Sequence, residues 1–70
     1  MSGMNERSRE IKSGTDLKVA RIRRGVRAVA VARRLEVSKQ RVSAIEASAH
    51  PTRAAVARYL AALEAEEAIQ

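Results

Sequence analysis

A cluster of hydrogen-bonding side chains stands near the middle of the sequence, where one short apolar pattern with helical spacing ends and another begins. Lys39, Gln40 and Arg41 follow Ser38 directly. Ammonium, amide and guanidinium groups recognise anions and polar edges through charge and hydrogen bonds. The cluster therefore has the chemistry of a binding surface.

Residues suited to catalysis or metal binding are sparse. The chain has no cysteine, which excludes disulfides, thiolate metal sites and thiol nucleophiles. His50 is the single histidine, and its place before Pro51 is most simply that of a turn residue. We therefore expect no enzyme activity, no metal site, no cofactor and no small-molecule ligand.

Charge is distributed unevenly along the chain. Residues 1–58 hold all 14 lysines and arginines and carry +9, whereas residues 59–70 carry −3. A basic body points to a polyanionic partner, nucleic acid above all, although a solubilising surface would give the same count. The longest apolar run, Ala28 to Ala32, is far too short to span a membrane. A cytoplasmic, bacterial or phage-encoded protein associated with the nucleoid is the expectation.

The spacing of apolar residues predicts four helices that would hold this cluster. The first covers about 16–24, with Thr15 as its N-cap and Gly25 at its end. Its inward stripe is expected to be Leu17, Val19, Ala20 and Ile22. Residues 1–14 precede it as a flexible basic arm, carrying Arg7, Arg9 and Lys12, which could follow a DNA backbone or stay loose.

The next two helices are joined by a turn too tight for an antiparallel hairpin. One covers about 27–34, and its expected inner residues are Ala28, Val29, Val31, Ala32 and Leu35. The other covers about 39–46, is capped by Ser38, and buries Val42 and Ile45. Val37 is expected to fill the corner between them.

A fourth helix is expected from about Thr52 to Ala65 or beyond, because Pro51 suits a helix start. Its inner face comprises Val56, Tyr59, Leu60 and Leu63. Tyr59 is expected in the core rather than as a stacking platform. Residues 66–70 would form an acidic tail.

The corner and its flanks resemble the helix-turn-helix of the phage repressor and Cro family, also called the XRE family. The resemblance covers residues 17–63 and rests on the small Ala32, the Leu35-Glu36-Val37-Ser38 corner, and the Val42 and Ile45 pair followed by Glu46. It implies an all-α fold: a compact bundle of four to five helices, as in lambda-repressor-like DNA-binding domains. The helix-turn-helix domain itself would cover residues 15–65.

The resemblance also implies a role for individual residues. Base-contacting positions would be Lys39, Gln40, Ser43 and Ala44, with Arg41 reaching base or phosphate. Phosphate contacts would come from Arg24, Arg27, Ser38 and Arg53, while one of Arg33 and Arg34 points away. Arg21 and Glu46 occupy the positions of a structural ion pair, with two solvated charges as the alternative.

Two positions depart from the family pattern. A glutamine that often contacts the DNA backbone is Ala28 here, so this contact is absent and Arg27 could replace it. The turn position usually held by glycine is Glu36. A left-handed conformation there would cost roughly 1 kcal/mol.

The resulting hypothesis is a sequence-specific, double-stranded DNA-binding transcriptional regulator of small repressor, Cro or antitoxin type. Such proteins usually bind palindromic sites as two-fold dimers, and the fourth helix with its tail is the expected dimer contact. The alternative is an adaptor or accessory regulator that holds another protein through that same helix and tail. RNA binding is weaker, because one aromatic residue cannot supply the stacking that single strands need.

Overall fold

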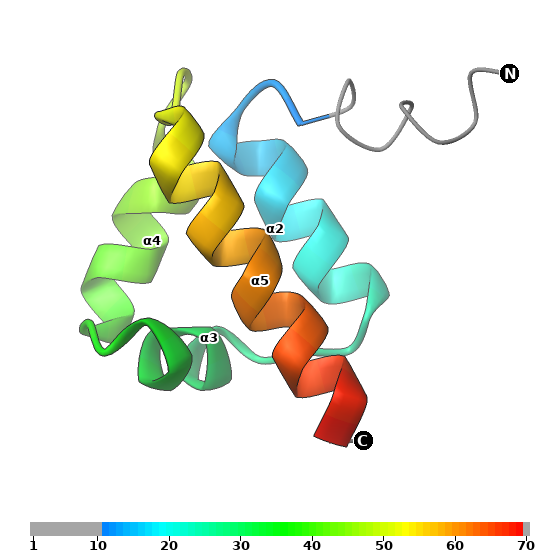
Figure 1. Ribbon diagram of the computed structural model, residues 1–70. Helices are drawn as coiled ribbons and strands as arrows, with labels where there is room; N and C mark the ends of the chain where they lie inside the picture. Colours follow the sequence, from blue (N-terminus) through cyan, green and yellow to red (C-terminus); the bar gives the residue numbers. More distant parts are fainter. Residues whose placement is uncertain (1–10, 70) are drawn as a thin grey trace, which may run out of the picture.

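The computed structural model describes residues 11–69, and the predicted arm falls largely outside them. The described part is helical, and its four helices are α2 (Gly14–Arg23), α3 (Ala28–Leu35), α4 (Lys39–Ala47) and α5 (Arg53–Ile69). The all-α fold class is thus confirmed. In Figure 1, α5 lies across the front of the bundle, with α2 and α4 behind it and α3 crossing one end.

α2 begins earlier than predicted. Its N-cap is Ser13, so the expectation of Thr15 was wrong. The Asp16 carboxylate accepts hydrogen bonds from the backbone N–H groups of Ser13, at 3.1 Å, and Lys12, at 2.7 Å. These bonds satisfy amides that no helical carbonyl can reach. The helix ends as expected before Gly25, whose φ of 69° is the left-handed conformation that glycine adopts without strain.

The start of α2 touches the end of α4 at Gly14. A Cβ atom at this position would lie 2.1 Å from the carbonyl oxygen of Ile45, so any side chain would separate the two helices. The Gly14 N–H also donates to the Ser48 carbonyl over 2.7 Å. This glycine therefore fixes one end of α4 against α2.

The core contains residues from all four helices and from the α2–α3 connection. Its buried members are Leu17, Val26, Val31, Ala32, Val42, Tyr59, Ala62 and Leu63. Leu35, Val37, Ile45, Val56 and Leu60 pack against them in part. The predicted inner faces of α4 and α5 are confirmed, and Val37 fills the corner as expected.

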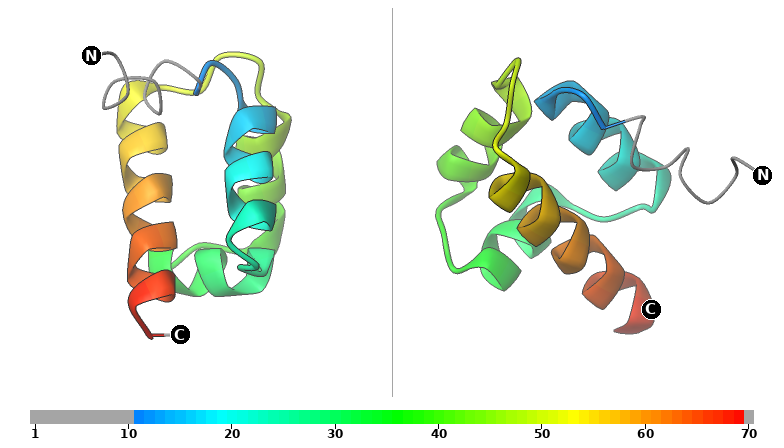
Figure 2. Two further views of the ribbon diagram at one scale, coloured as in Figure 1. Left: turned by 90° about the vertical axis from the view of Figure 1, so that its right-hand side faces the viewer. Right: turned by 45° about the horizontal axis from the view of Figure 1, so that its top comes forward.

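Three residues predicted to face inward do not. Val19, Ile22 and Val29 are 42%, 58% and 44% exposed, whereas Val26, in the connection, is buried. The face of α2 that carries Gly14, Leu17 and Arg21 is turned to its neighbours instead. Figure 2 shows why: among the described helices, α2 packs mainly against α4 and α5, and no other described helix covers its outer side.

Candidate nucleic-acid interface

The corner between α3 and α4 is built from two backbone features. Glu36 ends α3 in the left-handed region, at φ 59° and ψ 43°. Ser38 then caps α4, and its side-chain oxygen accepts a hydrogen bond from the Arg41 N–H over 3.1 Å. Both features were expected from the sequence. Together they turn the chain sharply, so that α4 starts at a large angle to α3 (Figure 1).

α4 presents its polar residues outward. Val42 is fully buried and Ile45 packs against the core, so the opposite side of the helix faces solvent. The exposed residues on α4 include every position assigned to base contact: Lys39, Gln40, Arg41, Ser43 and Ala44. At nine residues, the helix is roughly 14 Å long, which suits a major groove about 12 Å wide.

Three of the four residues expected at phosphates are exposed near helix starts. Arg27 is the N-cap of α3, Ser38 is that of α4, and Arg53 opens α5 just after Thr52. The Thr52 hydroxyl oxygen accepts from the Ala55 N–H at 3.0 Å. Helix starts expose unpaired N–H groups and carry a partial positive charge, which attracts anions.

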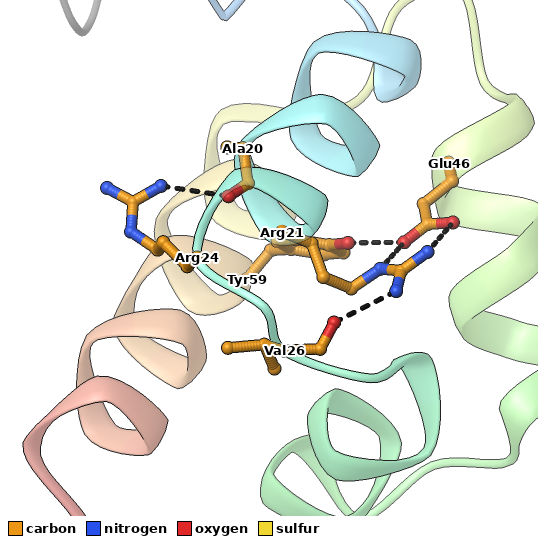
Figure 3. Close-up of polar contacts among 6 residues, drawn as sticks. All are labelled: Ala20, Arg21, Arg24, Val26, Glu46 and Tyr59. Carbon is orange, nitrogen blue, oxygen red and sulfur yellow. Dashed lines mark hydrogen bonds and ion pairs between the residues drawn. The ribbon is translucent and has the colours of Figure 1, made fainter. Parts of the chain in front are cut away.

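Arg24 is placed differently from the expectation. Its Nη1 donates to the Ala20 carbonyl over 3.2 Å, and its Nε lies 3.2 Å from an oxygen of Glu67 near the end of α5. Figure 3 shows its side chain pointing away from Arg21 and Glu46. The structure therefore does not bring Arg24 together with the outward face of α4, and it is left out of the interface proposed below.

Acidic residues at the end of α5 neutralise arginines of the earlier helices. Besides the contact between Arg24 and Glu67, the Nε of Arg34 donates to Glu66 over 2.7 Å. Arg33, one position earlier on α3, is exposed. Within residues 11–69, Lys39, Arg41, Arg27 and Arg53 form no ion pair. The free positive charge therefore includes α4 and the helix starts.

Arg21 and Glu46 form the expected ion pair. The Nε of Arg21 donates to Oε2 of Glu46 at 2.8 Å, and their side chains are only 12% and 9% exposed. Arg21 Nη1 also donates to the Val26 carbonyl at 3.0 Å. Burial acts to lower the pKa of Arg21, but the hydrogen bond and charge of Glu46 outweigh it, and the pKa is raised. A pair this enclosed holds α2 to α4, and loss of one partner leaves a buried charge.

A third member of this network was not foreseen. The hydroxyl group of Tyr59 donates to the same Oε2 atom of Glu46 (Figure 3). The sequence predicted a core position for Tyr59, which is confirmed at 0% exposure, but gave no partner for its hydroxyl group. A buried tyrosine usually finds a hydrogen-bond partner, and that rule was the available signal.

Two other kinds of site find no support in the described residues. Across residues 11–69, no group of three or more His, Cys, Asp and Glu side chains is arranged to hold a metal ion. Over the same stretch, every helix is too short or too polar to cross a lipid bilayer. The arrangement that remains is an exposed, cationic and amide-bearing helix on a rigid support.

Comparison with known proteins agrees with this geometry. The chain matches the helix-turn-helix domain family over residues 14–68, which takes in all four described helices almost completely. No curated protein and no solved structure matched. Because the match covers well over half of the sequence, the chain belongs to the helix-turn-helix domain family.

Proposed function

We propose that this protein is a sequence-specific regulator of transcription that binds duplex DNA with α4 in the major groove. The observation that carries the proposal is the outward face of α4, where Lys39, Gln40 and Ser43 are all exposed at the start and middle of a capped helix. Family membership supports DNA binding in general. The chemistry would serve a small repressor, a Cro-type protein or an antitoxin equally, and it calls for no catalytic step.

Each side chain on this face has a matching base edge. Gln40 can bond N6 and N7 of adenine at once, and Lys39 can donate to O6 or N7 of guanine. Ala44 offers only a methyl group, which suits the methyl group of thymine. A site read in this way would contain adenine and guanine at neighbouring positions.

Phosphate binding would come from Arg27, Arg53 and Ser38. The Ser38 oxygen already accepts from the Arg41 N–H, and its own O–H remains able to donate to a phosphate. α3 crosses one end of the bundle and α5 begins at the other, so Arg27 and Arg53 would hold the backbone at separated points (Figure 2). Contacts of this kind position a protein without reading sequence.

Binding as a two-fold dimer is part of the proposal, because one helix reads only a few base pairs. The exposed side of α5 supports it. Ala54, Ala57 and Ala61 are exposed and follow one another at spacings of three and four, so they share a face that a second helix could approach closely. The adaptor alternative would use this same face to hold a different protein.

The test compares three single variants on a duplex selected by the wild-type protein from a randomised pool. Gln40→Ala should lose about 1–3 kcal/mol of discrimination at one base position. Arg27→Ala should weaken binding to all sequences alike. Arg23→Ala is the control, because Arg23 is exposed and lies roughly 180° around α2 from Gly14, the residue in contact with α4. It should bind as the wild type does.

Salt gives an independent measure. The logarithm of the binding constant should fall with the logarithm of salt concentration, with a slope near −0.9 for each phosphate neutralised, and Arg27→Ala should reduce this slope by about 1. Equal binding of every duplex by all four proteins, with little effect of salt, would reject the DNA-binding proposal and favour the adaptor.

A further inference from the structure

Two donors from different helices converge on a single carboxylate oxygen in α4. Tyr59, from α5, donates its hydroxyl proton to Oε2 of Glu46, and Arg21, from α2, donates its Nε–H to the same atom over 2.8 Å (Figure 3). The second guanidinium contact, from Nη2 to Oε1, is long at 3.5 Å. Oε2 therefore accepts one hydrogen bond from α2 and one from α5.

Burial gives these two bonds their importance. Tyr59 is fully enclosed, and the Glu46 side chain is only 9% exposed, so water cannot readily replace a lost donor. A carboxylate held by Arg21 alone can still rotate about its last torsion, because that torsion has broad energy wells. A second donor at an angle to the first removes this freedom. The hydroxyl group of Tyr59 thus fixes the orientation of the Glu46 carboxylate.

Packing also holds α4, which lies against α2 and α3 to the same extent and begins at the corner capped by Ser38. Val42 is its one fully buried residue, Ile45 packs in part, and Gly14 touches only its last turn. Glu46 sits at one end of the helix and Gln40 near the other, six residues or roughly 9 Å away. Because α4 is one continuous helix, a rotation about its axis at Glu46 also moves the amide group of Gln40.

Base reading and phosphate attraction respond differently to such a displacement. A hydrogen bond to a base edge needs a heavy-atom distance of about 2.7–3.2 Å and good alignment. Attraction between a cation and a phosphate falls only with the inverse of distance, so it tolerates a shift of an ångström. An imprecisely held α4 would bind DNA but discriminate poorly among sequences.

We propose that Tyr59 is a positioning residue for base recognition: its hydroxyl group, bonded to Glu46, sets the angle at which α4 presents Gln40 to the DNA. This proposal rests on the function proposed above. It assigns to Tyr59 a role in specificity in addition to its place in the core.

The test is Tyr59→Phe, which keeps the ring and its packing and removes only the hydroxyl group. Binding is measured to the duplex selected by the wild type and to an unselected duplex of the same length, at a temperature where circular dichroism shows both proteins fully folded. We expect affinity for the selected duplex to fall about tenfold, the size of one lost base contact, and affinity for the unselected duplex to stay within about twofold.

Leu63→Val is the matched control for simple loss of core packing. Leu63 lies one turn after Tyr59 on α5, is equally buried, and has no part in the Glu46 network. This variant should melt at a lower temperature and keep the wild-type ratio of selected to unselected binding. A change in that ratio is therefore specific to the hydroxyl group.

The results separate the two proposals. If the wild type selects a sequence and Tyr59→Phe binds both duplexes as the wild type does, or loses both equally, Tyr59 only fills the core and the positioning proposal is wrong. If the wild type shows no preference for any duplex, the proposed function fails, and the role of Tyr59 fails with it.

Discussion

The proton of the Tyr59 hydroxyl group is held in a buried and negatively charged environment. Burial raises the pKa of Tyr59, and the hydrogen bond to Glu46 and the charge of that carboxylate raise it further, while Arg21 lowers it in part. The net pKa lies well above the ordinary value of 10. A phenolate formed here would face Glu46 without a hydrogen bond, so ionisation would break the network that holds α4.

Because Tyr59 is the sole tyrosine and the chain has no tryptophan, phenolate absorbance reports this one group. In the folded protein, Tyr59 should ionise well above pH 10, and in denaturant it should ionise near pH 10. The folded state holds the proton more tightly. The contribution of Tyr59 to stability is therefore complete below about pH 10 and is lost as the pH rises toward the folded pKa. Tyr59→Phe should lack this component, and ionisation near pH 10 in folded protein would contradict the buried hydrogen bond.

The four described helices were predicted from the sequence, but the face that each helix buries was predicted only in part. Capping and turn residues act locally, so Ser38, Gly25 and the left-handed Glu36 were predictable. The inner face of a helix depends on where its neighbours lie. Val19 and Ile22 are as apolar as Leu17, yet α2 turns Leu17 inward because Gly14 is the position at which α4 approaches. The spacing of apolar residues alone cannot predict that α4 approaches α2 at Gly14.

The candidate site was also predicted only in part. The positions on α4 came from resemblance and are exposed as expected, since one buried pair, Val42 and Ile45, fixes the outer face. The contact between Arg24 and Glu67 was not predictable, because the two residues are 43 positions apart in the sequence and meet only through the packing of α5. The cap of α2 was a missed local signal, since Ser13 and Asp16 have the spacing of a capping box.

Two positions with similar backbone angles give a paired prediction about the turns. Glu36, at φ 59°, should be relieved of strain by Glu36→Gly, raising the free energy of unfolding by up to about 1 kcal/mol. Gly25, at φ 69° with open space around it, should be strained by Gly25→Ala and lower that free energy by about 1 kcal/mol. Urea denaturation measures both.

Charge complicates only the first member of this pair. Glu36→Gln is its control, because it removes the charge and keeps the strain, and it should leave stability within about 0.5 kcal/mol of the wild type. If Glu36→Gly and Gly25→Ala change stability in the same direction, backbone strain does not govern these turns.

At the scale of the molecule, α5 has a basic start and an acidic end. Arg53 and Arg58 precede its middle, and Glu64, Glu66 and Glu67 follow it. Glu66 and Glu67 are engaged with arginines of α3 and α2. This arrangement places the acidic residues of α5 in its last turns. It also means that two copies of α5 placed side by side in opposite directions would set unlike charges against each other.

The exposed alanines of α5 would allow a second α5 helix to approach closely. Beside them, an open groove of about 290 Å³ runs between α3 and α5, lined by Arg34, Leu35, Arg58, Ala61, Ala62 and Ala65. A second α5 approaching along the alanines would also reach this groove. A chain of 70 residues buries only about 60% of its unfolded surface, so association would add stability that its own core does not supply.

The dimer proposal is tested by placing a charge on this face. Ala57→Glu should shift the protein from twice its 7.7 kDa mass toward monomer in sedimentation equilibrium, because an unpaired carboxylate cannot be buried between two helices without a large cost. The fold should persist, since Ala57 is exposed and glutamate is a good helix former.

Val19→Glu is the control on the exposed side of α2. Loss of the dimer in Val19→Glu with its retention in Ala57→Glu would move the interface from α5 to α2. The apolar residues left uncovered on α2 would then be the contact between subunits.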